Sequence, residues 1–417
     1  MKVAVYSICK NEEQHVLRWL KSVEEADRII VLDTGSEDNT RELLAQHPKV
    51  ELHTANFIPF RFDIARNMAA NQVPDDYDLA LFCDFDEVLE PGWRNKLEQT
   101  PAPYDAITLR MIFSRTADGE PDVVYNRLMA HRPHRYVWMY PIHEVLVPVN
   151  EHQNLVINSD VTVEHLPDPN KPRGQYLELL QTAVEEFNHD PRMRQYLGRE
   201  HMYREEWGSA IIHLEKHVQM GDSAVCTAES YRYLSRCHEA MGSIAQAERA
   251  LLQALAASPD QREPHAELSA FYQRLNDVER CLAFALTCAA VPDNPNYVIR
   301  ERRYYREWPH HMAAWAYSTL GVTDMAVRHI TWALNIAPEH PQVIADFISL
   351  TGKMPATLLQ RINSGELSVM TNEDEKEDVF PVSGNQQETV LGAESKQAEE
   401  VPENVSNVES PISSGAS

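Results

Sequence analysis

The segment from Leu79 to Glu87 constrains the fold more than any other part of this sequence. Leu79 to Cys83 is a continuous apolar run, which is typical of a strand buried in a parallel sheet. Carboxylates follow it directly, including Asp84 and Asp86. If the backbone stays extended, Asp84 and Asp86 point to the same side of the strand. Such a pair at the carboxyl end of a strand predicts a site for a hard divalent cation, and the alternative is a solvated acidic turn.

Apolar runs and amphipathic segments alternate through the first part of the chain. The first helix is predicted from residues that recur at helical spacing, namely Val16, Leu17, Leu20 and Val23. A second helix is expected to start near Ser36, inside a Thr/Gly/Ser/Asp turn sequence. Other apolar runs predict strands at residues 3–8, 28–32, 50–53, 106–113, 123–129 and 156–165, and a helix over 62–71. This alternation predicts an α/β domain over residues 1–170 with a mostly parallel sheet.

Residues 175–350 have a helical pattern with an internal repeat. Four anchor residues are each followed thirteen residues later by a small residue. The anchors are Leu197, Leu234, Leu268 and Ala313, and the small residues are Ala210, Ala247, Cys281 and Ala326. The first two anchor spacings are 37 and 34 residues, near the about 34 residues of tetratricopeptide helix pairs, and the last spacing of 45 indicates an insertion. The repeat predicts an all-α solenoid, with an ordinary helical bundle as the alternative.

Composition separates the end of the chain from the rest. From Thr371 onward there are 11 acidic and 2 basic residues and no apolar period, which predicts a disordered acidic tail over residues 371–417. The whole chain has a formal charge of −25, which argues against a protein that grips duplex DNA mainly through its phosphates.

The cysteines and the apolar runs bear on the cellular compartment. The six cysteines form no Cys-x-x-Cys pair, and we expect them to be reduced core residues. The sequence shows no signal peptide and no apolar run of about 18 residues. We therefore expect a cytoplasmic protein with no membrane span.

Polar residues gather at one edge of the predicted sheet. They are Asn11 and Glu12 after the first strand, Asp33 at the end of the second, Asp63, Arg66 and Asn67 in the helix before the fourth, and Asp84 and Asp86 after the fourth. A nucleoside diphosphate needs this mixture of acceptors for hydroxyl and imide protons, a guanidinium for phosphate oxygens, and carboxylates for a metal. The sequence has no Gly-x-Gly-x-x-Gly motif and no Gly-Lys-Ser/Thr loop, which argues against dinucleotide dehydrogenases and P-loop kinases.

Six segments resemble, in order, the motifs of family 2 glycosyltransferases with the GT-A fold. They are Lys10-Asn-Glu-Glu, the run from Ile30 to Thr40, Phe62-Asp-Ile-Ala-Arg66-Asn67, Asp84-Phe-Asp86-Glu87, Ile142-His-Glu144 and Glu164-His165. The subgroup that the chain resembles carries C-terminal tetratricopeptide repeats and includes the sublancin-type peptide S-glycosyltransferases. The resemblance implies a Rossmann-like GT-A domain followed by a tetratricopeptide-like solenoid. One departure is Phe62-Asp-Ile, where the subgroup more often has Asp-Phe-Ser.

The resemblance also implies how the donor is bound. Asn11, Glu12 and Asp33 would lie near a uridine-type nucleoside. Arg66 would face the diphosphate or the base, and the two residues that would brace its helix are Asp63 and Asn67.

The resemblance assigns the metal and the catalytic residues as well. Asp86 would ligate Mn²⁺ or Mg²⁺ directly, Asp84 would contact the ribose or a metal-bound water, and His165 matches a late histidine that many GT-A enzymes present to the metal. The residues alone leave His143-Glu144 open between a catalytic pair and a structural turn. The resemblance favours catalysis, with Glu144 as the general base and His143 as the next candidate.

Together these implications describe a metal-dependent enzyme of bacterial or phage type. It would move a sugar from a nucleoside diphosphate sugar, expected to be UDP-linked, to a hydroxyl or thiol with inversion. The acceptors left open are a peptide or protein, a glycan, and a hydroxymethylated DNA base of the kind that bacteriophages glycosylate. We expect the repeats to hold a macromolecular acceptor or to mediate self-association. The alternative is a non-catalytic scaffold whose repeats bind a partner and whose first domain has lost activity.

An arginine and aromatic cluster follows the strand predicted at 123–129. Its members are Arg127, Arg132, Arg135, Tyr136, Trp138 and Tyr140. Such a cluster is able to stack on an acceptor, including a nucleic-acid base. The alternative, which we favour, is an ordinary polar face with a buried tryptophan.

Overall fold

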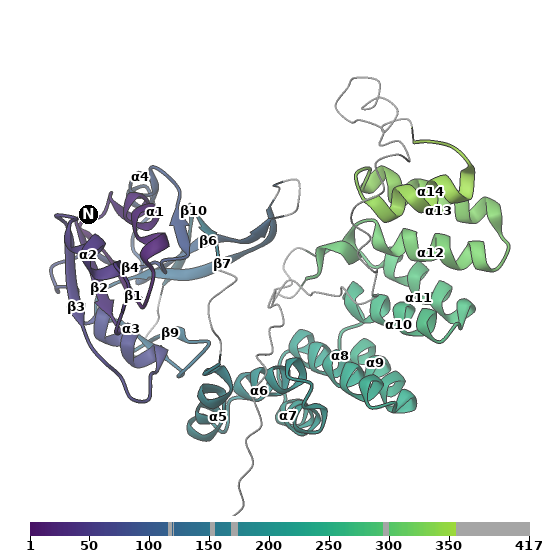
Figure 1. The fold of residues 1–417 in the computed structure, drawn as a ribbon, viewed down its shortest axis with the longest axis horizontal. Coiled ribbons are helices and arrows are strands. Elements are labelled where there is room, and N and C mark those ends of the chain that lie inside the picture. The colour runs from purple at the N-terminus through teal and green to yellow at the C-terminus, as the bar shows by residue number, and fades with distance from the viewer. Residues whose placement is uncertain (116–118, 120, 151–154, 168–173, 295–299, 356–417) are drawn as a thin grey trace, which may run out of the picture.

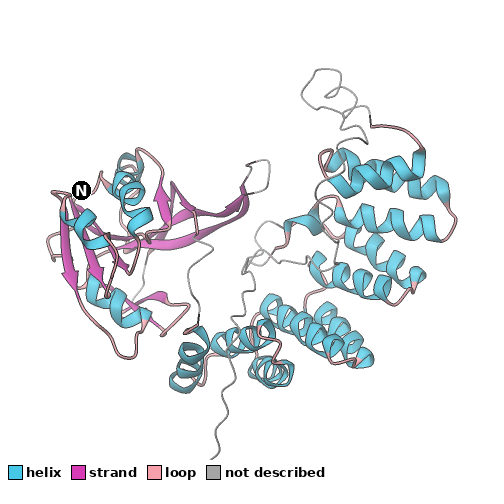
Figure 2. Cartoon of the chain, in the orientation of Figure 1, coloured by secondary structure: helices cyan, strands magenta, loops and turns pink. Residues whose placement is uncertain are grey.

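The computed structural model describes residues 1–115, 119, 121–150, 155–167, 174–294 and 300–355. It consists of a sheet-containing part followed by a stack of helices (Figures 1 and 2). The predicted tail over residues 371–417 lies outside the described residues, and so does most of the segment around the predicted domain boundary near residue 170. The described parts confirm an α/β domain followed by an all-α solenoid.

The first part contains one sheet of eight strands, in the order β3-β2-β1-β4-β7-β6-β10-β5, and a second sheet of two strands, β8 (Tyr136–Met139) and β9 (Val145–Pro148). The strands of the larger sheet are β1 (Val3–Cys9), β2 (Arg28–Asp33), β3 (Val50–Thr54), β4 (Leu79–Phe82), β5 (Glu87–Leu89), β6 (Ala106–Arg115), β7 (Pro121–His131) and β10 (Val156–His165). The pairs among β1, β2, β3 and β4 are parallel, as predicted. β7 runs antiparallel to β4 and β6, and β5 runs antiparallel to β10, so the sheet is mixed.

Helices cover both faces of this sheet. They are α1 (Glu13–Val23), α2 (Thr40–Ala45), α3 (Phe62–Ala70) and α4 (Trp93–Glu98). Trp19 of α1 and Trp93 of α4 belong to one buried apolar cluster, whereas Ala65 and Ala69 of α3 belong to the cluster on the other face. This arrangement leaves the carboxyl ends of the parallel strands available for a site.

The first helix is confirmed as α1, whose buried face passes through Val16, Trp19 and Leu20 and leaves Leu17 on the outer side, 68% exposed. One local prediction is wrong. The helix expected near Ser36 starts at Thr40, because the backbone N–H of Ser36 donates to Asp33 Oδ1 at 3.0 Å and closes a turn there.

The remaining helices form the solenoid. They are α5 (Tyr176–Glu186), α6 (Pro191–Tyr203), α7 (Trp207–Met220), α8 (Ala224–Ala240), α9 (Ile244–Ala257), α10 (Arg262–Arg274), α11 (Val278–Ala290), α12 (Trp308–Thr319), α13 (Thr323–Ile336) and α14 (Pro341–Thr351). The predicted anchors and small residues are all buried, at most 4% exposed. The insertion before the last anchor contains a 3₁₀ helix, η1 (Arg302–Tyr305). Stacked helix pairs of this kind confirm the tetratricopeptide-like solenoid.

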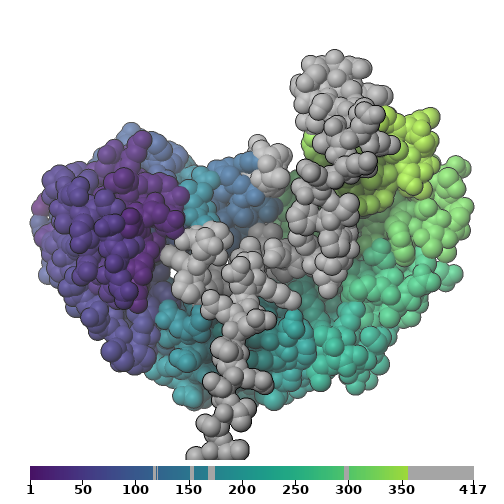
Figure 3. Space-filling view, in the orientation of Figure 1, coloured from purple at the N-terminus to yellow at the C-terminus, as the bar shows by residue number. Residues whose placement is uncertain are grey.

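The two parts meet through the first helices of the solenoid. Figure 3 shows the sheet-containing part at one side, the last helices at the other, and α5 to α7 in the base between them. None of the helices in the described part of the chain has the length and apolar character that a bilayer crossing requires. All six cysteines are free, and five of them are buried.

Candidate active site

The acidic segment after β4 forms a tight turn. β4 ends at Phe82, and the backbone N–H of Glu87 donates to the carbonyl of Asp84 at 3.0 Å. The Glu87 carboxylate accepts from the backbone N–H of Asp84 at 3.0 Å. The prediction that an extended backbone aligns Asp84 and Asp86 is therefore wrong. The turn lets separate tertiary contacts position the two carboxylates.

This turn places Asp86 beside His165. β5 pairs with β10 so that Glu87 lies opposite His165, and the backbone N–H of Leu166 donates to the Asp86 carbonyl at 2.6 Å. Asp86 Oδ2 lies 3.8 Å from His165 Nε2. Phe113 stacks on the His165 ring at a centroid distance of 4.6 Å, and its carbonyl lies 3.4 Å from Nδ1. The ring is therefore held with Nε2 toward Asp86.

The Asp86 and His165 pair fits a divalent cation that binds together with a nucleotide. A carboxylate oxygen and an imidazole nitrogen are suitable ligands for Mn²⁺, and Mg²⁺ accepts the carboxylate. Among the described residues, no group of three or more His, Cys, Asp or Glu is arranged to hold a metal ion. A cation here would take its other ligands from substrate phosphates and water, as Mg²⁺ in nucleotide sites usually does.

Arg66 on α3 connects Asp84 to Glu144. Its two terminal nitrogens donate to the two Asp84 oxygens at 2.9 and 3.1 Å, and its Nε donates to Glu144 Oε1 at 2.5 Å. The guanidinium also lies 4.1 Å from the centroid of the Phe82 ring. Burial by itself would lower the pKa of Arg66, but the charges of Asp84 and Glu144 outweigh burial and raise it. Arg66 therefore stays charged and holds both carboxylates in place. We call Asp84, Arg66 and Glu144 the Arg66 cluster.

Two further residues, Arg127 and Glu87, border this cluster, and nothing in the sequence predicts that they contact each other. Arg127 on β7 donates to the Glu87 carboxylate and lies 3.9 Å from Asp84 Oδ2. Burial raises the pKa of Glu87 to about 7, and the positive charge of Arg127 opposes that rise. Arg127 and Glu87 are 40 residues apart, so no local pattern in the sequence relates them.

The arginine and aromatic cluster predicted around Arg127 is not one surface. Trp138 is 3% exposed, and its indole N–H donates to the Tyr6 hydroxyl at 2.9 Å. Arg132 Nε donates to the Tyr104 carbonyl at 2.9 Å. Trp138 is therefore buried, as the favoured interpretation expected, whereas Arg127 lies at the acidic turn.

Asn67 and Asp63 make different contacts. The Asn67 side chain exchanges two hydrogen bonds of 2.8 Å with the backbone of Trp138 in β8 (Tyr136–Met139). Asp63 accepts two hydrogen bonds from Arg61, at 2.8 and 3.1 Å, and Arg61 also donates to Glu186 of α5. Asn67 thus ties α3 to β8, whereas Asp63 belongs to the contact between α3 and the solenoid.

The residues expected at the nucleoside lie in two interlocked loops. The backbone N–H of Asn11 donates to Ser36 Oγ at 2.9 Å, and Asp33, 1% exposed, accepts from the Ser36 N–H. The Glu12 N–H donates to Thr40 Oγ1 at 2.8 Å. These loops follow β1 and β2, and β1 pairs in parallel with β4, which precedes Asp84. Both groups therefore lie at the same edge of the sheet.

His143 and Glu144 point in different directions. They lie in the connection between β8 and β9 (Val145–Pro148). Glu144 meets Arg66, whereas the His143 ring packs on Tyr196 of α6 at a centroid distance of 4.2 Å. Geometry therefore brings Glu144 to the Arg66 cluster and His143 to the solenoid.

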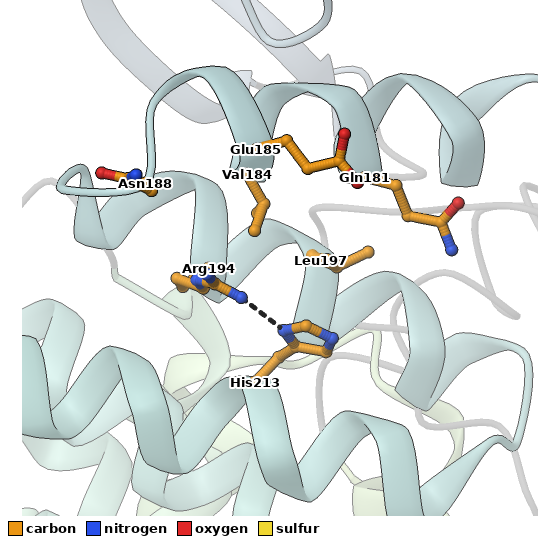
Figure 4. A pocket seen from close by; sticks show the side chains of 7 residues that line it. All are labelled: Gln181, Val184, Glu185, Asn188, Arg194, Leu197 and His213. Atoms are coloured by element: carbon orange, nitrogen blue, oxygen red, sulfur yellow. Dashed lines mark hydrogen bonds between the residues drawn. The ribbon is translucent and has the colours of Figure 1, made fainter.

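A separate pocket of about 390 Å³ lies between α5, α6 and α7 (Figure 4). Its lining residues are Gln181, Val184, Glu185, Asn188, Arg194, Leu197 and His213. Arg194 donates to His213 Nδ1 at 3.3 Å. Burial lowers the pKa of His213 to about 4, so the ring is neutral near pH 7 and its Nδ1 accepts.

The sheet-containing part is similar to a known enzyme family. The family model described as Glycosyl transferase family 2 matches residues 5–154. This match includes the Arg66 cluster and Asp86 but ends before His165. It supports a glycosyltransferase domain in this part of the chain.

A curated relative and several solved structures are also similar to parts of this chain. A TPR repeat-containing protein of Synechococcus elongatus is 31% identical over 147 residues, which is 35% of this chain and 35% of that protein. The match thus spans about a third of the curated relative. Solved structures include MamA protein, with a TM-score of 0.32, 15% identity and coverage of 47% of this chain and 87% of that one. Another is a thermophilic TPR protein of Thermus thermophilus, with a TM-score of 0.31, 19% identity and coverage of 42% and 89%. These structural likenesses are too low to bear on function.

Proposed function

We propose that this protein transfers a sugar from a nucleoside diphosphate sugar, UDP-linked, to a hydroxyl or thiol of a macromolecular acceptor. The observation that carries the proposal is the Arg66 cluster, which lies inside the segment that matches family 2 glycosyltransferases. Asp86 and His165 lie next to the same turn, where they would hold Mn²⁺ or Mg²⁺. Asn11, Glu12 and Asp33 would bind the nucleoside.

The chemistry follows from the charges that these residues place. A divalent cation, when bound, offsets negative charge on the departing diphosphate. Arg66 and Arg127 add two guanidinium groups beside the acidic turn. Glu144 takes the proton from the acceptor while the acceptor oxygen or sulfur bonds to the anomeric carbon. The bond from that carbon to the diphosphate breaks with its electron pair, and attack from the opposite face inverts the configuration.

The solenoid supports a macromolecular acceptor. Stacked helix pairs present an extended surface, which suits a peptide or protein, a glycan or a modified DNA base better than a free monosaccharide. Self-association through the repeats and a cytoplasmic location belong to the same proposal. The second candidate is a non-catalytic scaffold, which is compatible with a relative described by its TPR repeats.

Donor turnover by the purified full chain separates the two candidates. The protein is incubated with a panel of UDP-, GDP- and dTDP-sugars and Mn²⁺, and the released nucleoside diphosphate is measured. The transferase is supported if the wild-type chain releases the nucleoside diphosphate and the substitution Asp86→Asn abolishes this release. A wild-type chain that binds and turns over none of the donors contradicts the transferase and leaves the scaffold.

A further inference from the structure

The connection between β8 and β9, residues 140–144, is held by the first helices of the solenoid. Arg192 of α6 donates from a terminal nitrogen to the carbonyl of His143 at 3.1 Å. Its guanidinium lies 4.6 Å from the centroid of the Tyr140 ring. The Tyr140 hydroxyl donates to the Asp190 carboxylate, which also caps α6 by accepting from the backbone N–H of Arg192 at 2.8 Å.

Apolar contacts complete this attachment. Ile142 is 3% exposed and belongs to one buried cluster with Leu179 and Leu180 of α5 and Leu197 of α6. The His143 ring on Tyr196 extends the same contact. The connection is thus packed against α5 and α6 over most of its length.

The backbone of this connection needs such support. Tyr140 has φ of 80° and His143 has φ of 53°. Residues with a side chain adopt this left-handed conformation only where their surroundings hold them in it. Arg192 binds the carbonyl of one of the two residues and stacks on the ring of the other.

We infer that Arg192 is a positioning residue for Glu144. Arg192 fixes the His143 carbonyl, which belongs to the peptide bond that precedes Glu144, and the Glu144 carboxylate is thereby directed to Arg66. The inference rests on the proposed function, because Glu144 is the general base there. The solenoid then contributes to the chemical step through α6, beyond any part it plays in acceptor binding.

Arg194 provides a matched control. It follows Arg192 by two residues, which places it about 200° around the helix, and it lines the pocket on that other side of α6 (Figure 4). Its hydrogen bond goes to His213 and not to the connection. Arg192→Met and Arg194→Met therefore remove the same group from opposite sides of one helix.

The test uses the full chain with Arg192→Met, Arg192→Lys or Arg194→Met. Backbone hydrogen exchange is measured at residues 143–145, and turnover and donor KM are measured with the nucleotide sugar that the wild type uses. Arg192→Met should speed this exchange about tenfold or more, as expected when a hydrogen bond from a charged donor is lost. Turnover should fall by a similar factor while donor KM stays within about twofold. Arg192→Lys should keep most of the wild-type protection from exchange and most of the wild-type turnover, and Arg194→Met should change neither the exchange nor the turnover.

Equal rates of backbone hydrogen exchange at residues 143–145 in Arg192→Met and Arg194→Met would overturn the inference, whatever the turnover of the two variants. Faster exchange with unchanged turnover would also overturn it, because the connection would then not position a catalytic group. If Arg192→Met does not fold, Arg192→Lys is the deciding variant. Wild-type exchange and wild-type turnover in Arg192→Lys support the inference. If Arg192→Lys has the wild-type melting temperature but neither the wild-type exchange nor the wild-type turnover, the hydrogen-bond basis of the inference is overturned. If the wild-type chain turns over no donor, both the proposed function and the catalytic part of this inference are contradicted. The comparison of hydrogen exchange still shows in that case whether Arg192 holds the connection.

Discussion

Glu144 and Arg66 are 78 residues apart in the sequence, yet Arg66 Nε donates to Glu144 Oε1 at 2.5 Å. The same guanidinium donates to both oxygens of Asp84. The Arg66 guanidinium therefore holds the proposed general base, Glu144, in a fixed position relative to the acidic turn. This contact links the predicted donor residues to the predicted catalytic residue.

Asp86→Asn keeps the size of the side chain and removes its charge. We expect donor turnover to fall by about 100-fold or more and Mn²⁺ binding in the presence of UDP to weaken, because a hard cation prefers a carboxylate. Initial rates and calorimetry measure the two effects. Asp160→Asn, an exposed change on β10, should leave both unchanged. Full wild-type activity in excess chelator contradicts this prediction.

Glu144→Gln keeps an acceptor for Arg66 and removes the basic carboxylate. Turnover at saturating donor should fall by roughly 10²–10⁴-fold, while donor KM stays near the wild-type value, because a general base acts in the chemical step. Initial-rate kinetics measure both constants. An intact turnover number would place the base elsewhere, with His143 as the next candidate.

Arg66→Met removes the guanidinium that binds both Asp84 and Glu144. The Arg66 side chain is 7% exposed, and loss of one partner of a buried ion pair typically costs about 3–5 kcal/mol. Urea unfolding of the full chain measures the change in the free energy of unfolding of the first part. Arg280→Met is the control, because Arg280 is 51% exposed in its ion pairs, and it should leave the free energy of unfolding near the wild-type value. Similar effects of the two substitutions would contradict the buried role of Arg66.

Gly198→Ala should destabilise the first helix pair of the solenoid. A Cβ at this position would meet Leu214 at 2.7 Å from Cγ and 3.1 Å from the backbone nitrogen, so α6 and α7 would have to move apart. Such overpacking costs about 1–3 kcal/mol, more than the about 1 kcal/mol that alanine gains over glycine in a helix. Thermal unfolding is the measurement. Gly208→Ala in α7 meets nothing within 4 Å and should not lower the melting temperature.

His131 should make the stability of the first part depend on pH. Burial lowers the pKa of His131 from 6.5 to about 4, so between these pH values the unfolded chain binds more protons than the folded chain. Stability is therefore complete above pH 6.5 and is lost as the pH falls toward 4, by about 2–3 kcal/mol at pH 4.5. Urea unfolding at pH 7 and pH 4.5 measures this loss. His131→Gln should show a smaller loss by about that amount, and an equal loss in both proteins would contradict the assignment.

Local patterns in the sequence predict most of the elements of this fold. The apolar run from Leu79 to Cys83 forms a strand up to Phe82, and the anchors from Leu197 to Ala313 are buried in successive helix pairs. These features depend on the period of the backbone, which neighbouring residues determine. The order of the polar motifs also identifies the family that residues 5–154 match.

Contacts between segments that are far apart in the sequence decide how the residues of the candidate site are arranged. Asp86 meets His165 because β5 pairs with β10 beyond a turn, although an apolar strand followed by Asp-x-Asp suggests an extended backbone there. Glu144 reaches Arg66 from a connection that α6 holds through Arg192.

The sequence by itself thus determined most of the strands and helices, the repeat and the residues available for chemistry, because each depends on residues that are close along the chain. Only the tertiary structure decided which carboxylate faces which cation, and that the solenoid supports the connection carrying Glu144. The physical reason is that ion pairs and buried contacts form between side chains brought together by the packing of whole elements, and no local period records that packing.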